Sequence, residues 1–320
     1  MLITFDEAVT LINKGKPLHI AGTESLLKKL PKGNWIGGST EYFMAPEGCR
    51  ISGDVLFATQ FQYDTFKITS YDVENIQSLT SDAFNNGFSV VIVPFNSAVH
   101  KEYAQNAAGF KDMFIKSIVG WVAGINIDIA EQTPIAVNGI SGEICENKAV
   151  VLHLEVPAEK TVSINIINMF KQDEASPVIE FKEEGFSAEK CLIDGKEVNF
   201  ADYIMQNDID TRLPLVGDYS GTGVNTSFKS IEDDIVNFYA PVFSDIKYKI
   251  AENVSNYGED FKKIVSGHKD ADTVFSCNCI LNFLFCELDG KRIDAFPGPV
   301  TFGEIAYQLV NQTLVYVTVV

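Results

Sequence analysis

The sequence predicts an α+β protein with two mixed domains of largely antiparallel sheet and packed helices. The chain has 320 residues, more than the roughly 250–300 at which one hydrophobic core usually stops growing, so two domains are expected. Helix and strand patterns alternate in the first part of the chain, and strands predominate from Pro134 onward. Strands joined by short turns pair antiparallel, because a parallel neighbour needs a crossover of about a dozen residues.

The first expected element is a helix that follows Thr4. Thr4 and Glu7 have the spacing of a capping box, and Ala8 begins an apolar pattern at helical spacing. Further along the first half, apolar and alternating segments predict helices near 75–84 and 98–108 and strands near 55–61, 66–71, 89–94, 148–156 and 161–170.

A domain boundary is expected in the segment 171–190, which is acidic and poor in large apolar side chains. The predicted domains are therefore 1–185 and 186–320. The second opens with a hairpin, because Asp194-Gly195 supplies the positive φ angles of a tight turn. Helices near 200–205 and 259–266 and a last strand near 314–319 follow.

The charge balance excludes several classes of partner. With 43 acidic and 25 basic side chains, the formal net charge of −18 repels phosphate backbones and anionic lipid surfaces, so neither nucleic acid nor membrane is expected. No run of about 18 apolar residues and no signal-peptide pattern is present. Six scattered cysteines do not form a disulfide framework. These features predict a cytoplasmic protein with reduced thiols.

A short pattern occurs twice. Gly142-Glu143-Ile144 and Gly303-Glu304-Ile305 each place a carboxylate after a glycine and shortly before an apolar strand. The repetition suggests an internal duplication. A carboxylate beside a glycine turn can hold an amine if the pocket excludes water, so Glu143 and Glu304 are candidate ligand-binding residues.

Three motifs in the last third carry a family resemblance: Phe275-Ser276-Cys277, Gly303-Glu304-Ile305 and Asn311-Gln312-Thr313-Leu314. With them the sequence resembles the FIST family, intracellular sensory domains taken to bind small ligands such as amino acids. The resemblance implies FIST N-terminal-like and C-terminal-like domains, a sensory role in signal transduction, and a signal passed to a separate signalling protein.

The resemblance also implies a ligand site. It places a small polar molecule, such as an amino acid or related metabolite, near Cys277, Gly303, Glu304 and Asn311, with Glu143 added by the repeated pattern. Members of the family commonly carry an arginine shortly after the cysteine, whereas no basic residue follows here until Lys291. The ligand is therefore expected to be less anionic than those of other members.

No catalytic motif, metal motif or cofactor motif is evident, so no catalytic residue, metal or cofactor is expected. Besides a purely structural interaction protein, which would expose an apolar patch in place of a cavity, two alternatives stay open. One is a hydrolase that uses a cysteine or serine assembled from residues distant in sequence. The other is a haem-binding sensor, for which His100 is the candidate ligand.

Overall fold

The α+β class is confirmed. The computed structural model describes residues 1–129, 131–219, 221–268, 273–293 and 295–320. Its described helices are short: α1 (Phe5–Asn13), α2 (Glu24–Leu27), α3 (Leu79–Asp82), α4 (Ala98–Asn106), α5 (Phe200–Gln206), α6 (Tyr257–Gly267) and α7 (Ile280–Phe285). The predicted capping box is present, because Thr4 Oγ1 accepts from the Glu7 N–H while Glu7 Oε2 accepts from the Thr4 N–H.

Two mixed sheets contain most of the first half. The first has the order β1 (Leu2–Ile3), β6 (Leu56–Gln60), β2 (Leu18–Gly22), β3 (Trp35–Ser39), β10 (Ala136–Asn138) and β11 (Glu143–Cys145). The second has the order β26 (Gln308–Val310), β25 (Glu304–Ala306), β9 (Ser117–Ala123), β8 (Gly87–Pro94), β12 (Ala149–Glu155) and β7 (Phe66–Tyr71). β2 and β3 are parallel, as are β8 and β9, and the other neighbours are antiparallel.

A third sheet joins the two ends of the chain. Its order is β13 (Val162–Asn168), β27 (Thr313–Val319), β23 (Thr273–Cys279), β24 (Gly298–Thr301), β4 (Tyr42–Met44) and β5 (Arg50–Ile51). Strands from 1–185 and from 186–320 thus pair directly: β25 with β9, β27 with β13 and β24 with β4. The sheets are shared across the predicted domain boundary.

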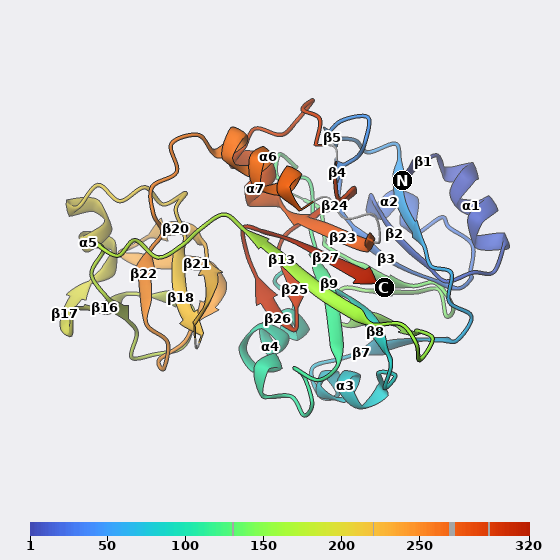
Figure 1. The fold of residues 1–320 in the computed structure, drawn as a ribbon, viewed down its shortest axis with the longest axis horizontal. Coiled ribbons are helices and arrows are strands. Elements are labelled where there is room, and N and C mark those ends of the chain that lie inside the picture. The colour runs from blue at the N-terminus through green and yellow to red at the C-terminus, as the bar shows by residue number, and fades with distance from the viewer. Residues whose placement is uncertain (130, 220, 269–272, 294) are drawn as a thin grey trace.

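Residues 171–219 and 221–251 form a lobe, seen at the left of Figure 1 with α5, whose Val216 and Ala240 share one buried apolar cluster with Phe302 of the larger body. One of its sheets has the order β17 (Lys196–Asn199), β16 (Lys190–Ile193), β14 (Ile179–Glu180), β22 (Tyr248–Ile250), β18 (Leu215–Tyr219) and β19 (Thr222–Thr226), and the other has β15 (Gly185–Ala188), β21 (Ile235–Val242) and β20 (Phe228–Glu232). The chain enters and leaves the lobe side by side, because Glu252 N–H donates to Lys171 O at 2.9 Å.

The core of the larger body lies where the first three sheets meet. One cluster of buried apolar side chains contains Phe57 of the first sheet, Trp121 of the second, and Phe275 and Val315 of the third. This packing brings β6 and β23 together although more than 200 residues separate them in the chain. No described helix has the length and apolar character needed to cross a membrane.

Candidate functional site

Glu304, the first residue of β25, is completely buried and hydrogen-bonded. Its Oε1 accepts from Thr301 Oγ1 at 3.0 Å, and its Oε2 accepts from Thr313 Oγ1 at 2.7 Å and from the Thr313 N–H at 3.3 Å. Burial raises the pKa of this carboxyl to about 8, although the threonine donors oppose the rise. Near neutral pH, Glu304 is therefore mainly a neutral carboxylic acid.

Gly303 and Asn311 lie next to each other beside Glu304. Gly303 has φ +148°, and a β-carbon at that position would lie 3.4 Å from Asn311 Nδ2. Asn311 is 1% exposed, and within the described residues neither its Nδ2 nor its Oδ1 has a hydrogen-bond partner. Asn311 and Glu304 are thus neighbours that do not hydrogen-bond to each other.

Cys277 and Glu143 have different surroundings. Cys277 is buried in β23 and its thiol donates to Gly120 O at 3.4 Å. Burial, with a smaller contribution from the charge of Glu304, raises the pKa of this thiol well above its usual value. Glu143 lies on β11 at the edge of the first sheet, where an ion pair with Lys148 at 2.7 Å lowers the pKa of its carboxyl. The structure groups Gly303, Glu304 and Asn311 and places Glu143 on another sheet.

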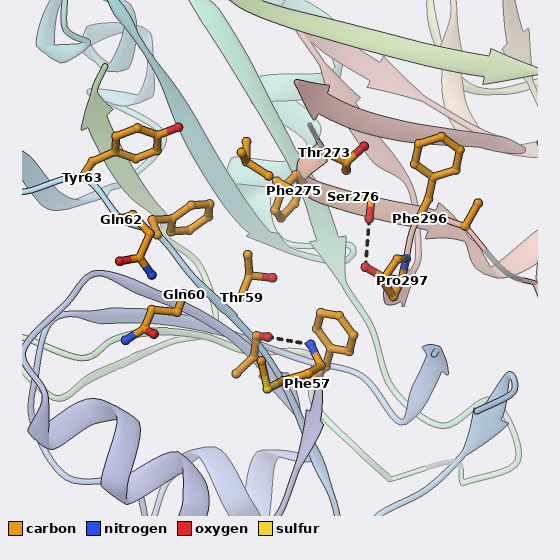
Figure 2. A pocket seen from close by; sticks show the side chains of 15 residues that line it. Phe57, Thr59, Gln60, Gln62, Tyr63, Thr273, Phe275, Ser276, Phe296 and Pro297 are labelled. Atoms are coloured by element: carbon orange, nitrogen blue, oxygen red, sulfur yellow. Dashed lines mark hydrogen bonds between the residues drawn. The ribbon is translucent and has the colours of Figure 1, made fainter. Parts of the chain in front are cut away.

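A cleft of about 830 Å³ opens between β6 with the segment that follows it and the start of β23 (Figure 2), and its lining includes none of Cys277, Gly303, Glu304, Asn311 and Glu143. This volume lies within the roughly 300–1,000 Å³ typical of small-molecule sites. The lining residues are Met1, Phe57, Ala58, Thr59, Gln60, Phe61, Gln62, Tyr63, Thr273, Val274, Phe275, Ser276, Ala295, Phe296 and Pro297. Figure 2 shows Phe275, Ser276 and Phe296 on one wall, facing Thr59 and Tyr63 on the other.

The aromatic side chains that line the cleft pack against further aromatic rings behind them. Phe61 and Tyr63 both make edge-to-face contacts with Phe88, at centroid distances of 5.7 and 5.9 Å. Phe275 makes an edge-to-face contact with His19 at 5.2 Å. Such pairs add about 0.5–1.5 kcal/mol to the stabilisation from burial. The walls are therefore largely preformed.

Phe296 occupies a backbone conformation that bulky residues avoid. Its φ is +52°, its side chain is buried, and its ring packs on Tyr316 with centroids 4.3 Å apart. A residue of this kind in the left-handed region costs on the order of 1–3 kcal/mol, and such strain concentrates at functional sites. Phe296 thus combines this backbone angle with a place in the lining of the cleft.

The cleft is electrically neutral in its side chains. No described lining side chain is acidic or basic, and the polar side-chain groups are the hydroxyls of Thr59, Thr273 and Ser276, the carboxamides of Gln60 and Gln62, and the Tyr63 phenol. The α-amino group of Met1 also lines the cleft and donates to Ala58 O at 2.8 Å, and burial lowers its pKa to about 6. His19, behind Phe275, accepts from the Trp121 indole N–H at 2.8 Å, and burial lowers its pKa to about 3. The neutral form of this imidazole is therefore favoured at physiological pH.

Sequence reasoning missed the β6 wall of the cleft. Phe57, Thr59, Phe61 and Tyr63 recur at every second position, which is the spacing that places side chains on one face of an extended segment. This alternation was the available signal. Nothing in the local sequence shows that the segment faces β23.

The thiols offer little support for a cysteine-dependent hydrolase. All six cysteines are free and buried, and burial raises the pKa of Cys49 and Cys145 to about 11 and of Cys191 and Cys286 to about 12. Burial also raises the pKa values of the Cys277 and Cys279 thiols well above the usual value. A thiolate is the reactive form of cysteine, so these environments disfavour nucleophilic attack.

One serine–histidine pair is present in the interior. Ser89 Oγ lies 2.7 Å from His153 Nδ1, His153 Nε2 lies 3.0 Å from Tyr71 Oη, and the Tyr71 hydroxyl donates to Asp82 at 2.7 Å. Since Tyr71 donates to Asp82, the network assigns the ring proton to Nε2 and makes Nδ1 the acceptor for Ser89. Ser89 is only 1% exposed, so the pair is closed to a substrate.

His100, the candidate haem ligand, is buried between Phe95 and Phe186 at centroid distances of 5.5 and 5.7 Å. Within the described part of the chain, neither ring nitrogen has a hydrogen-bond partner. Burial lowers the pKa of the imidazole to about 4. The described residues also contain no group of three or more histidine, cysteine or acidic side chains placed to hold a metal ion.

Comparison with known proteins assigns the chain to a family. A family of unknown function (DUF6976) matches residues 3–320, so the chain belongs to this family. No curated protein matches the sequence.

Proposed function

We propose that this member of the DUF6976 family is a sensory protein that binds a small, uncharged aromatic molecule in the cleft between β6 and β23. The observation that carries the proposal is the strained Phe296, buried in the wall of a cleft whose other rings are held from behind. A strained residue persists only where its surroundings impose it, and a binding site is a common reason.

The lining supports an uncharged ligand. Transferring an ionised group from water into a partly enclosed site is costly without a partner of opposite charge, and no described lining side chain supplies one. The Met1 α-amino group does not supply one near pH 7 either, because burial lowers its pKa to about 6 and favours its neutral form. A free amino acid brings both an ammonium and a carboxylate. A neutral aromatic metabolite that carries a carboxamide or hydroxyl suits the rings and the neutral polar groups better.

The sensory part of the proposal draws on the resemblance to FIST domains. In that role, the occupied cleft is recognised by a separate signalling protein. The cleft joins strands of two different sheets, so a ligand held between β6 and β23 would contact both and stabilise their relative position.

Thermal denaturation with added ligand tests the binding. Benzamide and nicotinamide serve as neutral aromatic probes, and L-phenylalanine serves as the charged comparison. We expect both amides to raise the melting temperature in a saturable manner and to bind more tightly than L-phenylalanine. Phe296→Ala should weaken amide binding at least tenfold, which corresponds to about 1.4 kcal/mol.

Two further variants separate binding from folding. Gln62→Ala changes an exposed residue at the rim of the cleft and should weaken amide binding several-fold without altering the fold. Phe114→Ala removes an exposed phenylalanine away from the cleft and should bind the amides like the wild type. The proposal fails if neither amide shifts the melting temperature or if Phe296→Ala and Gln62→Ala bind them normally. Tighter binding of L-phenylalanine than of the two amides would show that the cleft does not select uncharged ligands.

A further inference from the structure

A second, smaller cavity of about 150 Å³ lies where three strands end. β2 is followed by Thr23 and by Glu24 and Ser25 of α2, β3 by Thr40 and Glu41, and β9 by the segment 124–126, and all of these residues line the cavity. At about 30 Å³ for each water molecule, the volume corresponds to about five waters, or to a molecule of four to six non-hydrogen atoms.

The position of the cavity follows from the sheet topology. β2 and β3 run parallel, so Gly22 and Ser39 are paired and both strands end at the same edge. β9 of the second sheet ends there too, because the Gly124 N–H donates to Ser39 O and Ser39 Oγ donates to Gly124 O, each at 2.8 Å. The carboxyl ends of parallel strands are a frequent location for ligand sites, since the chain opens into loops there.

A pre-positioned carboxylate lines this cavity. Glu41 Oε2 accepts from Asn126 Nδ2 at 2.8 Å, and Glu41 Oε1 accepts from Gln132 Nε2 at 3.2 Å. The Gln132 carboxamide also accepts from the Asn126 N–H at 2.8 Å, which fixes the two donors relative to each other. Glu41 is therefore held by neutral donors, and each of its oxygens keeps acceptor capacity.

The charge around Glu41 favours a cation. No basic side chain lines the cavity within the described residues, and no ion pair joins Glu41 to a described lysine or arginine. The other lining carboxylate, Glu24, is paired with Lys28, the residue that follows α2. The hydroxyls of Thr23 and Ser25, 3.1 Å apart, add oxygen acceptors to the same cavity.

We propose that this cavity binds a small primary ammonium compound, with Glu41 as its counter-ion. An ammonium group offers three donors, which match the Glu41 carboxylate and the hydroxyl oxygens of Thr23 and Ser25. The volume limits the organic part to a few atoms. This site is distinct from the β6–β23 cleft, and its lining residues do not overlap with those of that cleft.

Calorimetric titration of the full chain with ethanolamine and propylamine near neutral pH, where both are ammonium ions, tests the proposal. We expect saturable binding of both, a loss of at least tenfold in Glu41→Gln, and retention of part of the affinity in Glu41→Asp, which keeps the charge. Glu47→Gln, an exposed residue outside the cavity, is the matched control and should bind like the wild type.

Several outcomes would overturn the assignment: no saturable binding, equal binding by Glu41→Gln and wild type, or equal binding of the neutral analogue 1-propanol. Tighter binding of Mg²⁺ or Ca²⁺ than of the amines would show that the cavity is a metal site and not a site for an organic ammonium compound. The two binding proposals can be tested independently. Phe296→Ala should leave amine binding unchanged, and Glu41→Gln should leave benzamide binding unchanged.

Discussion

Burial changes the acid–base chemistry of several single residues in this protein. It raises the pKa of Glu304 from 4.5 to about 8 and lowers the pKa of His153 from 6.5 to about 4. In both cases the neutral form is favoured because the interior solvates charge poorly. The folded state therefore binds a proton at Glu304 that the unfolded state releases, and it excludes a proton at His153 that the unfolded state accepts.

Glu304→Gln should change how stability depends on pH. Because the folded-state pKa of Glu304 lies above its unfolded value, its contribution to stability is fully present below pH 4.5 and is lost as the pH rises to about 8. Glutamine has no such titration. The free energy of unfolding of Glu304→Gln, relative to wild type, should therefore increase by a few kcal/mol between pH 4.5 and 8.

Denaturant unfolding at a series of pH values measures this difference. Glu143→Gln is the control, since Lys148 lowers the pKa of Glu143, the opposite direction to the shift at Glu304. A difference between Glu304→Gln and wild type that is constant from pH 4.5 to 8 would show that Glu304 is ionised in the folded protein.

Within single elements, local sequence signals are reliable where the backbone itself needs a particular residue. The Asp194-Gly195 turn was predicted from its two residues, and the structure joins β16 to β17 there with φ +48° at Asp194 and +79° at Gly195. A glycine reaches such angles without cost, whereas a residue with a β-carbon does not.

Gly195→Ala should therefore destabilise the protein by about 1–2 kcal/mol. A β-carbon at this position meets no atom within 4 Å, so the effect comes from the backbone angle alone. Gly109→Ala is matched to it, because Gly109 also has open space around its α-carbon but an ordinary φ. Thermal denaturation should show a lower melting temperature for Gly195→Ala only; equal effects of the two substitutions would contradict the backbone argument.

On the scale of the whole molecule, the first and last parts of the chain depend on each other. β9, β13 and β4 each pair with a strand that lies after residue 297. The lobe of 171–251 is different, since both of its sheets and an apolar cluster that includes Phe181, Phe200 and Phe238 lie within it. The predicted boundary at 185 therefore divides shared sheets, and the lobe has its own core.

Fragments of the chain test this organisation. Fragment 1–185 should give a poorly dispersed amide NMR spectrum and no cooperative thermal transition, because its strands lose their partners and expose buried apolar surface. Fragment 171–251 should give a dispersed spectrum, although a domain of this size is only marginally stable. Cooperative unfolding of 1–185 would instead support two independent domains divided near residue 185.

The sequence by itself determined the α+β class, the capping box at Thr4, the hairpin at Asp194-Gly195 and the approximate limits of α4 and α6, because these depend on the chemistry of neighbouring residues. Gly303, Glu304 and Asn311, which were predicted to bind a ligand, lie together because one short hairpin connects them, and their role in binding stays a prediction. Only the tertiary structure decided which strands share a sheet and which side chains face a cleft. Phe57 and Phe296 meet at one cleft through sheet pairings that span most of the chain, and such pairings depend on packing that no local pattern specifies.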